Sequence, residues 1–215
     1  MATRAWQRRE ELIGTAPSPT EALKQAAASP KRPVVLMDVG DNVGGGSAAD
    51  STILLAEALR LGVRNMLVIL YDPESVRACV QAGVGGQVSL RVGGKTDKLH
   101  GSPAPIVGVV RTLSDGKYIE EQVRHGGARF NDQGVTAVVE TPEEHTVILT
   151  SLRAAPMSLE QVLSVGVKPE RKQVIVAKGV VAPRAAYEPI ASQIILVNTP
   201  GSTSSDLSSF TYRRR

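Results

Sequence analysis

The sequence contains a single cysteine, Cys79, among 215 residues. One cysteine cannot form an internal disulfide, and it excludes a zinc site built from several thiolates. This composition fits a reducing compartment, so we expect a cytoplasmic protein. The chain also has no uninterrupted apolar run of roughly eighteen residues, the minimum for a transmembrane helix, and its first residues are too charged for a secretory signal. We therefore expect no membrane partner.

Aromatic residues are scarce, at 3% of the chain, and basic residues are not clustered. The formal net charge is +4, but outside the terminal run Arg213–Arg215 the lysines and arginines are interspersed with aspartates and glutamates. Surfaces that bind nucleic acid typically combine clustered Lys and Arg with aromatic side chains. We therefore expect no nucleic-acid partner.

The three histidines carry no metal-site pattern. His100, His125 and His145 fall in the β-rich middle of the chain without H-x-H or H-x-x-x-H spacing. A zinc site made by this chain alone has little support, and we expect each histidine to be a surface or turn residue. The sequence also lacks the G-x-S-x-G pattern of a serine-hydrolase nucleophile.

Residues 38–50, which we call the glycine loop, combine acids, an amide and consecutive glycines between two regular elements. Pro33–Met37 is a short apolar run typical of a strand buried on both faces, and residues 51–61 have helical periodicity. Gly44–Gly46 allow the backbone to approach a ligand closely, and the first N–H groups of the helix are unpaired within it. We expect Asp50 to cap this helix.

Strand and helix patterns alternate along much of the chain. Further strands are expected at 66–71, 173–178 and 193–198, and further helices at 74–82, 158–165 and 184–191. The middle third instead predicts two hairpins, 106–113 with 117–122 around Ser114–Lys117, and 134–140 with 145–151 around Thr141–Glu144. We therefore predict an α/β fold, a parallel sheet with helical crossovers and an antiparallel β-rich insertion in the middle third.

Three of the predicted helices end on the same pattern, a glycine followed by a valine. The glycines are Gly62, Gly83 and Gly166. We expect each glycine to take the left-handed conformation while the valine packs back onto the last helical turn.

The first 30 residues predict two helices that carry little apolar surface, at 3–13 and 19–28. Ser18, Pro19 and Glu21 form the start signal of the second helix, with a capping box. We interpret residues 1–30 as a helical connector, 31–198 as the α/β domain and the Ser/Thr-rich residues 199–215 as a flexible tail. Such a connector should dock either on the body of this domain or on a missing one. We expect the partner to lie elsewhere, so that both helices expose apolar surface around Trp6.

Two nucleotide-binding motifs are matched only in part. Gly44–Ala49 fits the dinucleotide fingerprint G-x-G-x-x-A, but Gly40–Val43 separates it from the strand, and the next acid at a strand end, Asp72, comes too late. Gly93–Thr96 looks like the end of a P-loop, but the motif's first glycine is replaced by Ser89. Neither match predicts a nucleotide site.

Polar residues follow several of the predicted parallel strands. In such sheets, ligands bind at the carboxyl ends of the strands. These residues are Asp38, Asp41, Asn42, Asp72, Lys178 and Asn198. They could bind a peptide-like substrate, position water or support a metal. Alternatively, Asp41 and Asn42 only hydrogen-bond the glycine loop as Asx turns. In the functional case their side chains should point toward a concavity near Lys178.

Several segments together resemble the C-terminal domain of the microcystinase C (MlrC) family of microcystin-degradation metallopeptidases. They are Pro33–Gly46, Asp50–Thr52, Tyr71–Val76, Gly93–Asp97, Arg184–Ala191 and Asn198–Gly201. The resemblance implies a two-domain zinc hydrolase acting on a peptide-like substrate. The N-terminal domain would supply the metal ligands, and the loop Asp-x-Gly-Asp-Asn-x-Gly-Gly-Gly would face them. The chain departs from the family pattern at Gly179, Ala182 and Pro183.

This resemblance implies a composite active site whose residues can be named. Asp38, Asp41 and Asn42 would orient substrate or metal-bound water, and Lys178 would counter developing negative charge. A carbonyl oxygen or carboxylate would be received by the amides of Gly44, Gly45 and Gly46. We expect this chain alone to hold zinc weakly and to lack peptidase activity. The alternative is a non-catalytic module whose glycine loop binds an anion or a partner chain.

Overall fold

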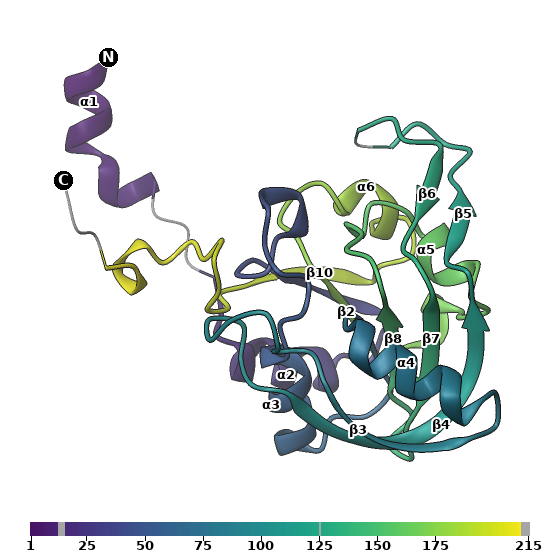
Figure 1. The fold of residues 1–215 in the computed structure, drawn as a ribbon. Helices are drawn as coiled ribbons and strands as arrows, with labels where there is room; N and C mark the ends of the chain where they lie inside the picture. Colours follow the sequence, from purple (N-terminus) through teal and green to yellow (C-terminus); the bar gives the residue numbers. More distant parts are fainter. Residues whose placement is uncertain (13–15, 125, 212–215) are drawn as a thin grey trace.

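The structure is a computed structural model that describes residues 1–12, 16–124 and 126–211 (Figure 1). Its centre is an eight-stranded sheet in the order β10-β1-β9-β2-β8-β7-β4-β3. The strands are β1 Val34–Asp38, β2 Met66–Tyr71, β3 Gln87–Val92, β4 Ala104–Ser114, β7 Thr136–Glu140, β8 Thr146–Thr150, β9 Val174–Ala177 and β10 Gln193–Val197. Neighbours from β10 to β8 pair in parallel, and those from β8 to β3 pair antiparallel. The predicted fold class is confirmed.

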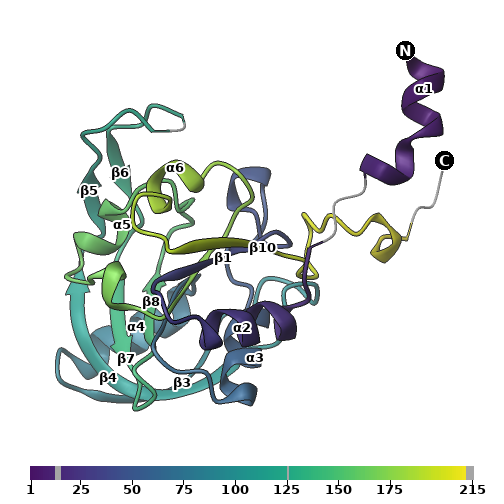
Figure 2. The same cartoon turned by 180° about the vertical axis from the view of Figure 1, so that it is seen from behind.

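Helices cover both faces of the sheet, with α4 on the strands β3, β4, β7 and β8 (Figures 1 and 2). They are α2 Pro19–Ala28, α3 Ile53–Leu61, α4 Pro73–Ala82, α5 Glu160–Leu163 and α6 Arg184–Tyr187. Alternate residues of β1 face opposite ways: Leu36 packs in the core with α2, α3 and α4, whereas Met37 packs in the core with α5 and α6. This two-sided burial explains why the parallel strands are continuous apolar runs.

The β-rich insertion differs from the prediction in one pairing. The hairpin around Thr141–Glu144 is confirmed, because β7 and β8 pair antiparallel. The hairpin expected around Ser114–Lys117 is wrong: β4 pairs with β3 and β7, while β5 Lys117–Ile119 pairs with β6 Phe130–Asp132 in a separate ribbon. Strand β7 pairs with the edge of β4 at which β5 was expected, and the apolar residues of β7 complete the core. Strand β5 therefore lies outside the main sheet.

The helix ends agree with the sequence pattern at two of three glycines. Gly62 and Gly166 have positive φ and are followed by buried valines, as predicted. Gly83 has φ 73° and ψ 169°, and Val84 is 66% exposed, so the expected valine contact is absent there. Helix α6 is shorter than the predicted 184–191 because Pro189 has no N–H to continue it. Helix α5 is also shorter than the predicted 158–165.

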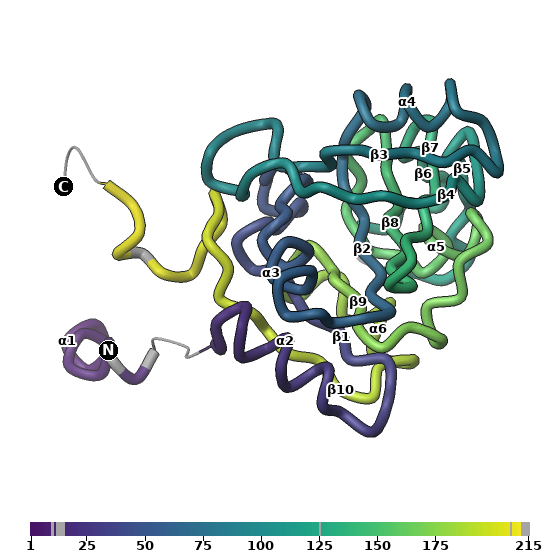
Figure 3. The backbone as a smooth tube through the Cα atoms, turned by 90° about the horizontal axis from the view of Figure 1, so that it is seen from below, coloured from purple at the N-terminus to yellow at the C-terminus, as the bar shows by residue number. Residues whose placement is uncertain are grey.

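The N-terminal residues divide into a docked helix and a projecting one. Helix α2 begins with the predicted capping box, but its Ala22, Leu23 and Ala26 are fully buried in this chain's own core, so the expectation of a packing partner elsewhere is wrong for this helix. Helix α1 Ala2–Gln7 and the short 3₁₀ helix η1 Arg9–Leu12 stand away from the sheet, on the side where the C-terminal segment also extends (Figures 1 to 3). The end of the predicted helix 3–13 lies outside the described residues. Trp6 is 70% exposed, as predicted.

No helix in the described part of the chain is both long and apolar enough to cross a membrane.

Candidate functional site

The glycine loop leaves β1 at the carboxyl end of the parallel strands and turns through the 3₁₀ helix η2 Val43–Gly45. Helix α3 begins at Ile53 with Thr52 at the cap position, so the predicted cap at Asp50 is wrong. The Asp50 carboxylate instead accepts the N–H groups of Lys95 and Thr96, each at 2.9 Å. The partners of this carboxylate lie in a segment distant in sequence, so a local sequence pattern cannot reveal them.

Asp38, Asp41 and Lys178 form a buried ion cluster beneath the glycine loop. The ammonium Nζ of Lys178 lies 2.9 Å from Asp41 Oδ2 and 3.3 Å from Asp38 Oδ2, and it donates to the Ser51 carbonyl at 2.8 Å. Lys178 is 4% exposed and both aspartates are fully buried. The adjacent strands β1 and β9 bring the three residues together, because Lys178 directly follows β9. All three Nζ–H donors are therefore occupied.

Asp41 faces Lys178 and also folds back onto its own loop. Its carboxylate accepts from Ser47 Oγ at 2.6 Å and from the N–H groups of Ala49 and Ser51 at 2.7 Å each. Burial alone would raise the pKa of Asp41, but Lys178 and these hydrogen bonds outweigh it and lower the pKa to about 2. Burial would likewise lower the pKa of Lys178, and the two carboxylates raise it instead. Both groups stay charged at neutral pH.

The outward side of the loop is formed by Gly44–Gly46, which are exposed, and by half-buried Asn42. Two of the three glycine amides are already used, since Gly45 N–H donates to the Asn42 carbonyl and Gly46 N–H to the Val43 carbonyl. Within the described residues, the Gly44 amide and the Asn42 side chain have no hydrogen-bond partner. A side chain at position 45 would press on Asn42 and Thr203, 3.1 Å from its Cβ.

Residues 199–204, which we call the C-terminal strap, bind across the base of the loop. Thr199 Oγ1 donates to Asp38 at 2.6 Å and accepts from Gly40 N–H at 2.7 Å. Thr203 Oγ1 accepts from Asn42 N–H at 2.9 Å. A Cβ on Gly40 would collide with the carbonyl oxygens of Thr199 and Pro200, so only glycine fits this close approach. We expected a loosely held tail from Thr199, but its first residues are anchored.

A histidine that sequence reasoning treated as a surface or turn residue is part of this network. His100 is fully buried, and its Nδ1 lies 2.9 Å from both carboxylate oxygens of Asp97. Its Nε2 accepts from Ser202 N–H at 3.2 Å and lies 3.9 Å from Asp41 Oδ1. His145 is also fully buried, with Nδ1 accepting from Met66 N–H, and His125 lies outside the described residues. The D-x-x-H spacing of Asp97 and His100 was the only local signal.

Comparison with known protein families assigns the part of the chain that contains the glycine loop and the C-terminal strap to a family. The family model described as the MlrC C-terminus matches residues 36–214. The chain belongs to the MlrC C-terminal family. The predicted resemblance is therefore confirmed.

Two relatives show how this MlrC C-terminal domain occurs in longer proteins. Microcystinase C from Sphingomonas sp is 34% identical over 94 residues, which are 43% of this chain and 18% of that protein. A solved structure from Mesorhizobium sp. BNC1, described as a "Putative metallopeptidase", is similar with a TM-score of 0.85 and 28% identity, covering 97% of this chain and 41% of that one. This chain thus spans less than half the length of either relative.

A second polar cluster of the MlrC C-terminal domain lies at the end of β2. Asp72 is 2% exposed, caps α4 by accepting from Ser75 N–H, and also accepts from Gly93 N–H. The Nζ of Lys95 lies 3.0 Å from Asp72 and 3.1 Å from Glu74. The backbone N–H groups of the Gly93–Thr96 segment thus bind the carboxylates of Asp50 and Asp72. The glycines of this segment are explained by these contacts, and no bound phosphate is needed to account for them.

The described residues of the MlrC C-terminal domain do not fit a zinc ion. They contain no group of three or more His, Cys, Asp or Glu side chains that could hold a metal. Asp38 and Asp41 are committed to Lys178, and the Nδ1 of His100 to Asp97. A zinc site needs three or four donors that converge on one point with free lone pairs.

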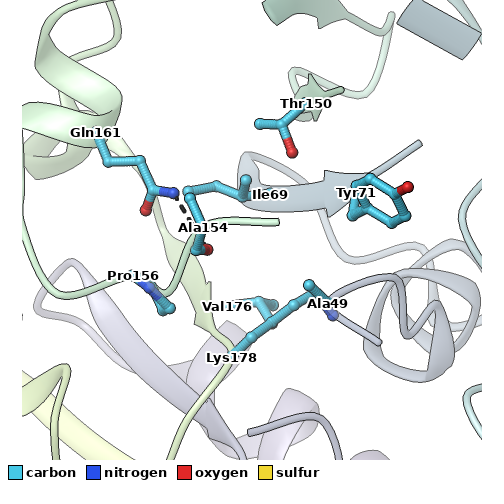
Figure 4. A pocket seen from close by; sticks show the side chains of 9 residues that line it. All are labelled: Ala49, Ile69, Tyr71, Thr150, Ala154, Pro156, Gln161, Val176 and Lys178. Atoms are coloured by element: carbon cyan, nitrogen blue, oxygen red, sulfur yellow. Dashed lines mark hydrogen bonds between the residues drawn. The ribbon is translucent and has the colours of Figure 1, made fainter. Parts of the chain in front are cut away.

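The cavity beside Lys178 is too small for a substrate. It has a volume of about 10 Å³, and Figure 4 shows its lining, including Tyr71, Thr150, Gln161 and the stem of Lys178. Such a volume holds about one water molecule. Asp41 and Asn42 do not line it, so their side chains do not point into this cavity near Lys178 as the functional interpretation expected.

Proposed function

We propose that this chain is the C-terminal domain of a zinc-dependent peptidase or amide hydrolase. The domain contributes the Asp-x-Gly-Asp-Asn-x-Gly-Gly-Gly loop to a composite active site, and the metal ligands lie on a separate N-terminal domain. Membership of the MlrC family and the similarity to the metallopeptidase-related structure support a hydrolase of this kind. The much greater length of both relatives supports a separate metal-binding part.

The burial pattern of the glycine loop supports this proposal most strongly. Asp38 and Asp41 are fully buried and ion-paired, whereas Gly44–Gly46 are exposed at the carboxyl ends of the parallel strands. A buried charged cluster beneath an exposed glycine turn is a costly arrangement that gives the turn one fixed geometry. Fixed backbone donors are what a site needs in order to stabilise a developing oxyanion.

The proposal assigns different roles to the buried and the exposed residues. Asp38, Asp41 and Lys178 act as positioning residues, because their polar atoms are occupied by one another and by the loop. The Gly44 amide and the Asn42 side chain are the groups offered to a substrate carbonyl or carboxylate. Gly45 and Gly46 act through their lack of side chains, which leaves the approach to that amide open.

A chimera tests the proposal. This chain replaces the matching 41% of the Mesorhizobium protein, which the high structural similarity permits. We expect metal-dependent hydrolysis of linear peptides by the chimera and none by this chain alone. In the chimera, Asn42→Ala should lower kcat/KM by about 10²-fold, the usual cost of one oxyanion donor, with little change in melting temperature. Gln193→Ala is the matched control, because it removes an exposed amide at the start of β10, at the end of the parallel strands opposite the glycine loop.

Two outcomes would contradict the proposal. Peptide turnover by the isolated chain with stoichiometric, chelator-resistant zinc would show that no second domain is needed. A folded, metal-loaded chimera that binds peptides but never hydrolyses them, while the parent Mesorhizobium protein does, would favour the alternative of a non-catalytic binding module.

A further inference from the structure

A second cavity lies beside the glycine loop, between the β5–β6 ribbon and the segment 153–158 that follows β8. Its volume is about 220 Å³, and its lining includes Tyr118, Arg124, Asn131, Arg153, Met157 and Ser158. This volume is below the range of about 300–1000 Å³ for drug-sized ligands. It suits a single amino-acid residue.

The cavity adjoins the exposed glycines. The terminal methyl of Met157, which lines the cavity, lies 3.4 Å from the position that a Cβ on Gly44 would take. Ala154 lines both this cavity and the small one beside Lys178. A peptide whose carbonyl reaches the Gly44 amide could therefore place a neighbouring side chain in this cavity.

The charged residues of the cavity differ in whether they are already paired. Arg124 donates to the Ala185 carbonyl and lies 3.6 Å from the carboxylate of Glu120, which is 6% exposed. Asp132 accepts from Gly134 N–H. Arg153 forms no ion pair with any described residue; its guanidinium carbon lies 5.0 Å from the centroid of the Tyr71 ring.

An arginine stacked on an aromatic ring keeps its edge N–H donors available, and it loses less conformational freedom when it binds a carboxylate. Planar guanidinium groups pair with carboxylates through two parallel hydrogen bonds. Of the charged groups in this cavity, Arg153 is the one presented in this way.

We propose that this cavity is a subsite for a carboxylate-bearing side chain of the substrate, with Arg153 as the carboxylate partner and Tyr71 holding the guanidinium in place. The assignment of this cavity as a substrate subsite rests on the proposed function. The binding of a carboxylate by the cavity can nevertheless be measured on this chain without any hydrolysis.

Nuclear magnetic resonance on the ¹⁵N-labelled chain tests the proposal. The probe is N-acetyl-L-glutamate α-amide, whose only free carboxylate is on the side chain, and the neutral comparison is N-acetyl-L-glutamine α-amide. We expect saturable amide shifts at residues of the β5–β6 ribbon and of segment 153–158 with the glutamate probe. Arg153→Gln should weaken its Kd by about tenfold or more, since hydrogen bonds to charged groups are among the stronger ones.

Arg111→Gln is the matched control, because it removes the same charge from an exposed arginine that pairs with Glu140 on the main sheet and does not line this cavity. The proposal is overturned if the glutamate probe causes no saturable shifts, or if the glutamine probe binds as tightly. Equal losses in both arginine variants would also overturn it, since they would show only general charge attraction. If the glutamate probe binds in an Arg153-dependent way and the folded, metal-loaded chimera is inactive, the carboxylate site is upheld and the proposed peptidase function is rejected.

Discussion

Replacing Lys178 by methionine should be strongly destabilising, because it leaves the carboxylates of Asp38 and Asp41 buried without a cation. Lys178 lies within 3.3 Å of both, and the cluster is almost fully buried. The lowering of the Asp41 pKa from 3.8 to about 2 corresponds to about 2 kcal/mol for that residue, to which Lys178 is a main contributor. With the uncompensated charges added, we expect a loss of about 3–5 kcal/mol in the free energy of unfolding.

Urea denaturation followed by circular dichroism is the appropriate assay, because the one tryptophan, Trp6, is exposed on the projecting helix and does not report on the core. The difference between Lys178→Met and the wild type should be largest at pH 7 and should shrink toward pH 3. The depressed pKa of Asp41 gives the wild type stability above about pH 4 that is lost as the pH falls toward 2.

In the variant, protonating Asp41 removes an unpaired buried charge. Arg111→Met, at an exposed ion pair, is the control and should cost at most about 1 kcal/mol. If Lys178→Met costs no more than this control at pH 7, the cluster does not hold the loop.

Three further predictions concern other parts of the chain. Gly40→Ala should lower the melting temperature far more than Gly46→Ala. A methyl group at position 40 would collide with the C-terminal strap, whereas a methyl group at position 46 meets open space and only has to adopt a strained φ of 92°. Burial lowers the pKa of His145, so the wild type should lose stability as the pH falls below its ordinary value of 6.5, and urea titrations between pH 8 and 5.5 should show a flatter profile for His145→Gln. Trp6→Ala should change the free energy of unfolding by less than about 0.5 kcal/mol, and acrylamide should quench the wild-type fluorescence readily.

Much of the fold could be predicted because its signals are local. The capping box of Ser18 and Glu21, the two-sided apolar runs of β1 and β2, and the turn at Thr141–Glu144 each act through neighbours in sequence. The hairpin at Ser114–Lys117 failed although its local signal was equally clear. Strand β7 competes for the edge of β4 and completes the core, and no local pattern carries that information.

The candidate site shows the same limit. The sequence pattern predicts Asp50 as a helix cap, but in the fold its carboxylate accepts hydrogen bonds from the backbone N–H groups of Lys95 and Thr96 instead. His100 has no metal-site spacing, yet it joins Asp97 to Ser202 in the buried network. These contacts join residues far apart along the chain, so only the folded arrangement could reveal them.

The sequence by itself determined the family, most of the strands and helices in chain order, and the placement of the glycine loop after a buried strand. Glycines, caps and apolar periodicity set local backbone conformation, and the family motifs are contiguous. Only the tertiary structure decided that Lys178 lies between Asp38 and Asp41, and that residues 199–204 bind across the loop. Which charges pair depends on the order of strands in the sheet, because β9 inserts between β1 and β2 and brings its lysine to the loop.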